Sequence, residues 1–154
     1  MRIAAALIFA LALPMAGFAG AAQGMAAPAA GGFTVTVEIT NVRNAKGRVH
    51  VDLCRQKEFL KDCPIRADGK AVQGTTILTV HHVPAGDYGA QTSHDENLNG
   101  KVDQGLFGIP KEGIGFSNDA PIRLAPPRWA NAVFSVSSDK TIKIKTRYML
   151  GGAG

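Results

Sequence analysis

Apolar and polar residues alternate along several short segments of this chain. From Phe33 to Ile39 every second residue is apolar, and the residues between them are threonine or glutamate. Residues 49–53 alternate in the same way. Because successive side chains of a β-strand point to opposite faces of a sheet, this spacing of two predicts strands that each turn one apolar face toward a core.

Further β-rich segments follow, and turn-forming residues separate them. The turn signals are Asn41–Gly47, Pro84–Asp87 and Ser138–Asp139, of which the last is expected to be a hairpin turn. Beyond the first 32 residues, no stretch of adequate length has the apolar spacing of a helix. The pattern therefore predicts an all-β protein, an antiparallel β-sandwich of about seven strands with one long structured loop. The remaining predicted strands are 75–83, 88–93, 122–124, 131–137 and 140–149.

The N-terminal segment is typical of a secretory signal peptide. Arg2 precedes an apolar run, Ile3–Met15, and small residues follow it. A retained membrane anchor is the alternative, but the run is shorter than the roughly 18 residues that a spanning helix needs. This predicts a periplasmic or secreted protein with no integral membrane span after processing. The expected parts of the chain are a signal peptide at 1–21, a flexible linker at 22–32 and one β-sandwich domain at 33–150.

Export changes how the two cysteines are interpreted. Cys54 and Cys63 enclose a mainly polar insert, and an oxidising compartment favours a disulfide between them. Closing so short a loop contributes about 2–3 kcal/mol in the loop-entropy account. The spacing does not fit a Cys-x-x-Cys redox motif, and a catalytic or metal-binding thiol is the less favoured alternative.

The balance of charges is mildly basic. The 154 residues carry a formal net charge of +5, from 17 Lys and Arg against 12 Asp and Glu. Between Lys140 and Lys145, basic residues alternate with isoleucine. This alternation indicates a half-buried strand with a solvated face, in preference to a nucleic-acid or lipid-binding patch. Aromatic residues that could stack on bases do not interleave with the cations, so nucleic acid is not expected as a partner.

The segment His94–Pro121 interrupts the strand pattern and contains a candidate calcium loop. A loop of this length inside a compact domain is either disordered or held in shape by local interactions such as a bound ion. Gly100 permits a sharp turn, and oxygen donors stand at the alternate positions that a calcium loop uses. The candidate ligands are Asp95, Asn97, Asn99, the carbonyl of Lys101, and Asp103.

The match to a calcium loop is incomplete. Leu106 occupies the position of the bidentate glutamate, so we expect Glu112 to fold back as a further carboxylate ligand. Glu96 and Asp119 are weaker candidates. With so few charged ligands, the predicted dissociation constant is on the order of 10⁻⁴ to 10⁻³ M. The alternative is a run of Asx turns, in which the side-chain oxygens bind their own backbone and no ion is required.

The later part of the long loop carries apolar residues, Ile109, Ile114 and Phe116, that we expect to pack against the sandwich. Two arrangements are compatible with such packing. One is a preformed surface pocket between the loop and the sheet, and the other is a packed cap without a ligand. The sequence favours the packed cap.

The histidines provide an enzyme alternative. His81 and His82 are adjacent in a predicted strand, so their side chains are expected on opposite faces. His94 adjoins the acidic loop and could act as a base with Asp95 or Glu112. The chain shows no recognisable order of nucleophile, base and orienting group, so we assign no catalytic residue.

Several of these motifs together resemble a known family. The segments His94–Asp103, Gly108–Gly113 and Gly115–Asn118, with Pro84–Tyr88 and Trp129–Phe134, closely resemble the bacterial family catalogued as domain of unknown function 2141. The resemblance implies an exported, small β-sandwich without an established activity.

The turn at Pro84–Tyr88 is also similar to one in transthyretin-like and adhesin-repeat sandwiches, so an immunoglobulin-like or transthyretin-like arrangement is expected. Asn99 stands where those adhesin repeats often have aspartate, which implies weaker calcium binding.

These observations favour an exported binding or structural module with a candidate calcium-stabilised loop. The expected partner is an envelope protein or a glycan. Two alternatives stay open: a periplasmic enzyme that uses His94, Asp95 and Glu112, and an adhesive or envelope-assembly subunit. The sequence leaves the ligand and the oligomeric state open.

Overall fold

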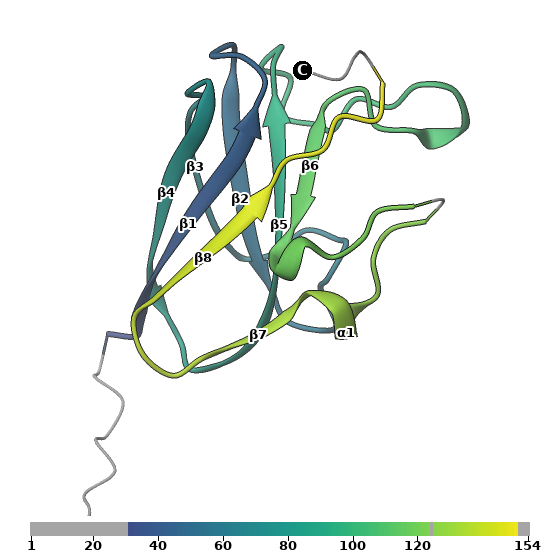
Figure 1. Cartoon of the computed structure of the whole chain (residues 1–154). Coiled ribbons are helices and arrows are strands. Elements are labelled where there is room, and N and C mark those ends of the chain that lie inside the picture. The colour runs from purple at the N-terminus through teal and green to yellow at the C-terminus, as the bar shows by residue number, and fades with distance from the viewer. Residues whose placement is uncertain (1–30, 124, 151–154) are drawn as a thin grey trace, which may run out of the picture.

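The computed structural model describes residues 31–123 and 125–150, and their fold is a β-sandwich of two sheets (Figure 1). The predicted signal peptide, residues 1–21, lies outside the described residues, as does the predicted linker except for Gly31 and Gly32. Among the described residues, no helix is long and apolar enough to cross a membrane. The prediction of a β-sandwich is confirmed.

The first sheet has three strands in the order β4 (Gly74–Val83), β1 (Phe33–Val42) and β8 (Lys140–Lys145). The second has the order β3 (Ile65–Lys70), β2 (Arg48–Cys54), β5 (Gly86–Asp95) and β6 (Gly113–Phe116). The short strand β7 (Val133–Val136) pairs with the first half of β5, so that β5 has β7 and then β6 along the same edge. The helical turns are η1 (Leu106–Gly108), η2 (Ser117–Asp119) and α1 (Trp129–Ala132).

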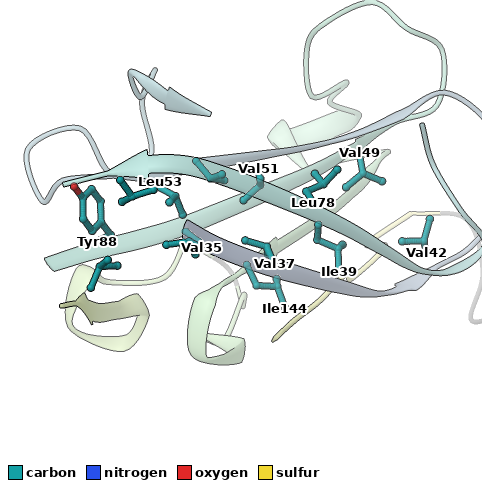
Figure 2. Close-up of a cluster of buried hydrophobic side chains, with 14 of the residues drawn as sticks. Val35, Val37, Ile39, Val42, Val49, Val51, Leu53, Leu78, Tyr88 and Ile144 are labelled. Carbon is teal, nitrogen blue, oxygen red and sulfur yellow. The ribbon is translucent and has the colours of Figure 1, made fainter. Parts of the chain in front are cut away.

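The core lies between the two sheets and is built from the alternating positions that the sequence marks as apolar. Val35, Val37 and Ile39 of β1 face Val49, Val51 and Leu53 of β2, and all are fully buried (Figure 2). Tyr88 closes one end of this core, and its hydroxyl donates to the Pro84 carbonyl at 2.8 Å. Alternation alone thus identifies the inner face of these strands.

The pairing of the last two strands corrects a prediction. Ser138–Asp139 was expected to form a hairpin turn, but β7 pairs with β5 and β8 pairs with β1, so the chain crosses there from one sheet to the other. β8 is parallel to β1, which makes it the exception among otherwise antiparallel pairs. Asp139 accepts the backbone N–H of Thr34 at 2.8 Å and fastens the crossover to β1.

Other boundaries also differ from the predictions. The sequence pattern does not predict the strands β3 and β6, and β6 lies within the segment 94–121, which interrupts that pattern. The predicted strand 122–124 is wrong for Ile122 and Arg123, which belong to a loop, and residue 124 lies outside the described residues. The predicted strand 131–137 is wrong at its start. Asn131 and Ala132 belong to α1, and Val133 is the first residue that pairs with β5.

The adjacent histidines of β4 do not lie on opposite faces. His81 and His82 are both exposed, while Val80 and Val83 on either side are buried. His82 has a φ of 58°, and the pairing of β4 with β1 shifts register here. This bulge places an extra residue on the outside and so breaks the alternation.

A disulfide joins Cys54, the last residue of β2, to Cys63 with a Cα–Cα distance of 5.1 Å. The predicted pairing is therefore confirmed. Beside it, Phe59 packs edge-to-face against Phe116 and Trp129. These residues form a second, smaller apolar cluster separate from the core between the sheets.

Candidate functional site

A cleft of about 700 Å³ lies on the outer face of the five-stranded sheet. Two loops border it: the long loop between β5 and β6, residues 96–112, and the described residues 120–123 and 125–128 that precede α1. In Figure 1 both loops project from the same side of the sandwich. This volume falls in the range of small-molecule binding sites.

The floor of the cleft consists of two rows of side chains that run across the strands. Residues opposite each other on paired strands place their side chains on the same face. The first row is His50 on β2, Ser93 on β5 and Ile114 on β6, and the second is Asp52, Gln91 and Phe116.

Two polar groups of this floor have capacity left for a ligand. Gln91 is fully engaged, because its amide donates to Asp52 Oδ2 at 3.2 Å and to the Lys61 carbonyl at 2.9 Å, and its oxygen accepts the Leu60 N–H. The other oxygen of Asp52 and the hydroxyl of Ser93 make no hydrogen bond to any described residue. They are therefore available to a head group in the cleft.

His50 stands at the end of the floor nearest the long loop. Its Nε2 lies 3.8 Å from Asp95 Oδ2 and makes no hydrogen bond within the described part of the chain. This atom is buried against Asp95, although the imidazole as a whole is partly exposed to the cleft. The ring thus connects the cleft floor to the residue where the loop begins.

The walls of the cleft are mainly apolar. Val102, Phe107 and Ile109 come from the long loop, and Ile122 comes from the opposite segment. Leu60, Met149, Ala125 and Pro126 add apolar surface, and the polar side chains of Gln104 and Arg123 also line the cleft. The expected packing of Ile114 and Phe116 against the sandwich is present, yet Ile109 stays partly exposed, and a cleft separates the loop from the sheet instead of a closed cap.

Carboxylates at the two ends of the long loop hold it in shape. Asp95 is buried, and its two oxygens accept the backbone N–H of Asn99 at 3.2 Å and that of Gly100 at 2.8 Å. Glu112, only 4% exposed, accepts the N–H of Glu96 at 3.0 Å and that of Asp103 at 3.2 Å. Both carboxylates therefore serve as acceptors for partly buried backbone donors of the loop.

The remaining candidate calcium ligands bind one another. Asp103 accepts the side-chain amides of Asn97 at 2.8 Å and Asn99 at 2.9 Å. The amide oxygens of the two asparagines accept backbone N–H groups two residues further along, at Asn99 and Lys101. These are the Asx turns of the alternative interpretation, and in this arrangement amide nitrogens, not amide oxygens, face the Asp103 carboxylate.

Among the described residues, no group of three or more His, Cys, Asp or Glu side chains gathers closely enough to hold a metal ion. Ligands such as asparagine and a main-chain carbonyl fall outside this criterion, so the calcium site stays a prediction. The two weaker candidates are engaged elsewhere: Glu96 pairs with Arg43, and Asp119 accepts the N–H of Lys145 at 3.0 Å.

The predicted base, His94, is a buried structural residue. Its side chain points into the protein, and its Nε2 binds the Lys46 carbonyl at 2.8 Å while its Nδ1 binds the Tyr148 hydroxyl at 2.7 Å. Because a carbonyl can only accept, Nε2 is the donor in its bond to Lys46. His94, Asp95 and Glu112 are all absent from the cleft lining, so the structure does not bring the three residues of the enzyme alternative together in this cleft.

An ion pair beside this histidine fixes the start of the long loop. Arg43 donates to both carboxylate oxygens of Glu96, and its guanidinium lies 4.4 Å from the ring centre of Tyr148. The hydrogen bond from Arg43 lowers the pKa of Glu96, and the same bond raises the pKa of Arg43. Burial raises the pKa of Tyr148, whose hydroxyl also accepts the Arg43 backbone N–H at 3.0 Å.

Sequence reasoning identified the loop but missed the cleft floor. His50, Asp52, Gln91 and Ser93 occupy the polar positions of alternating strands, which the sequence marks only as facing away from the core. The signal that could have selected them is their position opposite a long loop rich in apolar residues. Recognising it requires the pairing of β2 with β5, which is not a local property of the sequence.

The family comparison agrees with the motifs. A family model described as "Uncharacterized protein conserved in bacteria (DUF2141)" matches residues 37–145, which span β1 to β8 and include the whole cleft floor and the long loop. No curated protein and no solved structure matched the chain. The likeness to transthyretin-like sandwiches therefore stays a prediction. From the match over most of its length, the chain belongs to the DUF2141 family of bacterial proteins.

Proposed function

We propose that this chain is an exported binding module whose cleft holds a small amphipathic molecule. The observation that carries the proposal is the cleft of about 700 Å³ on the outer face of the five-stranded sheet. Its walls are apolar, which suits a hydrocarbon body, and monomeric proteins rarely keep such surface exposed without a use.

The floor suggests the chemistry of the ligand's polar end. Asp52 offers a carboxylate oxygen and Ser93 a hydroxyl, both without a partner in the described part of the protein. A hydroxyl or ammonium group could donate to Asp52, whereas a carboxylate placed there would be repelled. A hydroxyl-bearing head includes the sugar of a glycolipid, which keeps the predicted glycan partner within this proposal. An envelope-protein partner stays a prediction.

Titration calorimetry with decylamine, decanol and decanoate tests the cleft and its head group. We expect decylamine and decanol to bind more tightly than decanoate, and Val102→Asp to weaken all three. Ile77→Asp is the matched control, because Ile77 is an exposed apolar residue on the opposite sheet. Equal affinities of wild type and Val102→Asp would refute the cleft as the binding site. If Asp52→Asn binds the three probes with the same order of affinities as wild type, Asp52 does not contact the head group.

Export is a separate part of the proposal. It is supported by the N-terminal Arg2 and apolar run, and by the Cys54–Cys63 disulfide, since disulfides persist mainly outside the cytoplasm. Fractionation of bacteria that express the full chain, with mass spectrometry of the product, tests it. An unprocessed protein confined to the cytoplasm would contradict export.

We also propose that calcium stabilises the long loop, on the spacing of Asp95, Asn97, Asn99, Lys101, Asp103 and Glu112. Binding would require the two asparagine amides to turn their oxygens toward the ion. At calcium concentrations about tenfold above the dissociation constant, the expected gain in unfolding free energy is about 1.4 kcal/mol. The test is the melting temperature of wild type and of Asp95→Ala with and without millimolar calcium. If calcium raises neither melting temperature, the calcium proposal is wrong and hydrogen bonds alone hold the long loop.

A further inference from the structure

The walls of the cleft carry two polar side chains that are available to a ligand, in addition to Asp52 and Ser93 on its floor. Gln104 comes from the long loop, and Arg123 comes from the segment before α1 that forms the opposite wall (Figure 1). Neither side chain makes a hydrogen bond or an ion pair with any residue that the structure describes. The cleft therefore combines apolar surface with unpartnered polar groups on both its floor and its walls.

The two fixed charges of the lining have opposite signs and come from different elements. Asp52 supplies a carboxylate from β2, and Arg123 supplies a guanidinium from the wall. Among the described residues, His50 is the other titratable group of the lining, and its buried Nε2 lies 3.8 Å from Asp95. A ligand with a single charge can pair with only one of the two fixed charges. A ligand with a positive and a negative end can pair with both.

The charged residues beside the cleft floor are bound to other groups. Arg66 stands opposite Asp52 on β3, but its guanidinium donates to the Cys63 carbonyl, at 3.2 Å from Nε and 2.8 Å from Nη2. Asp68 on the same strand pairs with Arg48. Neither Arg66 nor Asp68 lines the cleft, and the charged residues of the long loop do not line it either. Asp52 therefore keeps one carboxylate oxygen for a donor that enters from the cleft.

The neutral polar groups of the lining indicate what lies between the two charged ends of the ligand. Ser93 is in the floor row nearest the long loop, and the long loop carries Gln104. A hydroxyl and a carboxamide can each donate and accept, so they match the N–H and C=O groups of a peptide bond. A plain hydrocarbon chain would leave both side chains without partners in a cleft from which the ligand excludes water.

We propose that the cleft binds a short apolar peptide with both ends free, an inference that rests on the proposed function and names the ligand class of the same cleft. The peptide's ammonium group donates to Asp52, and its carboxylate pairs with Arg123. Its amide groups bind Ser93 and Gln104, while its apolar side chains lie against the walls. A ligand with only a carboxylate still leaves Asp52 without a donor, so the expected order of decylamine and decanoate is unchanged.

Titration calorimetry with trileucine and its end-blocked forms tests the proposal. Trileucine amide lacks the negative end, and N-acetyl-trileucine lacks the positive end. We expect wild type to bind trileucine about threefold more tightly than the amide, which is the effect of one exposed ion pair. It should bind trileucine about tenfold more tightly than the acetylated form, because Asp52 then loses a charged donor. The compound ω-aminooctanoate carries both charges without amide groups, and it should bind more weakly than trileucine.

Two variants assign each end of the peptide to its residue. In Arg123→Gln, trileucine and its amide should bind equally, while the preference over the acetylated form remains. In Asp52→Asn, the preference over the acetylated form should disappear, while the preference over the amide remains. Arg128→Gln and Asp62→Asn are the matched controls, because these exposed residues carry the same charges and do not line the cleft. Both controls should keep the wild-type preferences.

The results separate this inference from the proposed function. If decylamine binds and the peptides do not, or if wild type binds trileucine and its amide equally, the peptide is the wrong ligand and the amphiphile cleft stands. Binding of ω-aminooctanoate as tight as that of trileucine would also overturn the peptide, as would equal preferences in Arg123→Gln and Arg128→Gln. If neither the peptides nor decylamine bind, the proposed function and this inference are both wrong.

Discussion

Glu112 lies at the end of the long loop, and its buried carboxylate accepts the backbone N–H of Asp103, in the middle of that loop, at 3.2 Å. Its other oxygen accepts the N–H of Glu96 at 3.0 Å. One side chain therefore joins the beginning, the middle and the end of the segment that forms a wall of the cleft.

We expect Glu112→Ala to lower the free energy of unfolding by about 2–3 kcal/mol, because two partly buried N–H groups lose a buried, charged acceptor. Urea unfolding measures the loss, and amide exchange at Glu96 and Asp103 should accelerate. Glu38→Ala is the matched control, because Glu38 forms a surface pair with Lys143 at 3.3 Å and should cost less than about 1 kcal/mol. Equal losses in the two variants would contradict the role of Glu112.

Substitution of two glycines by alanine allows the free-energy cost of backbone strain to be compared with the cost of a steric clash. Gly47 and Gly74 both have positive φ, at 69° and 91°. A Cβ at Gly47 would lie 1.8 Å from the Asp95 carbonyl oxygen, whereas a Cβ at Gly74 would meet no atom within 4 Å. The turn before β2 can thus lie against the start of the long loop only if residue 47 lacks a side chain.

We expect Gly74→Ala to cost about 1 kcal/mol, from strain alone. Gly47→Ala should cost several times more, since the backbone at Asp95 must move as well. Urea unfolding of the two variants gives the comparison. Similar losses at both positions would show that the turn and the loop are not in the close contact described above.

How much of this fold the sequence predicts depends on how local each feature is. The strands β1 and β2 are predicted because Val35 to Ile39 and Val49 to Leu53 alternate without interruption. β6 escapes prediction because it is only the four residues Gly113–Phe116, two of them glycine, and β5 alone defines it as a strand. β3 escapes for a related reason, since two of its inward positions, Ala67 and Gly69, have little or no apolar side chain.

The candidate site divides in the same way. The organising role of Asp95 and the turn at Gly100 follow from local spacing, and the structure places both as hydrogen-bonding elements of the loop. The crossover at Ser138–Asp139 and the floor beneath the loop depend on which strands pair. Pairing partners lie far apart in the chain, so no short pattern specifies them.

The disulfide supports the side of the cleft opposite the long loop. We expect a variant with Cys54→Ala and Cys63→Ala to lose about 2–3 kcal/mol of unfolding free energy, because the open insert gains conformational freedom when the chain unfolds. Reduced wild type should unfold at nearly the same urea concentration as this variant. Leu60, on the same insert, should show faster amide exchange in both. An unchanged unfolding midpoint after reduction would contradict a stabilising bridge.

The ion pair of Arg43 and Glu96 predicts a dependence of stability on pH. The hydrogen bond from Arg43 lowers the pKa of Glu96 in the folded protein. A depressed carboxyl pKa contributes stability that is fully present above the unfolded value, which is about 4.3 for glutamate, and that is lost as the pH falls through the lower folded value. The two side chains are partly exposed, so solvent screening limits the contribution to about 1 kcal/mol.

Glu96→Gln should therefore be less stable than wild type by a constant amount near neutral pH, and the difference should fade only in acid below about 4.3. Urea unfolding of both proteins over a pH series measures it. Glu38→Gln, on the opposite sheet, controls for the loss of a surface carboxylate. A difference that persists unchanged into strong acid would mean that Glu96 acts through packing, since a protonated carboxyl no longer offers Arg43 a charged partner.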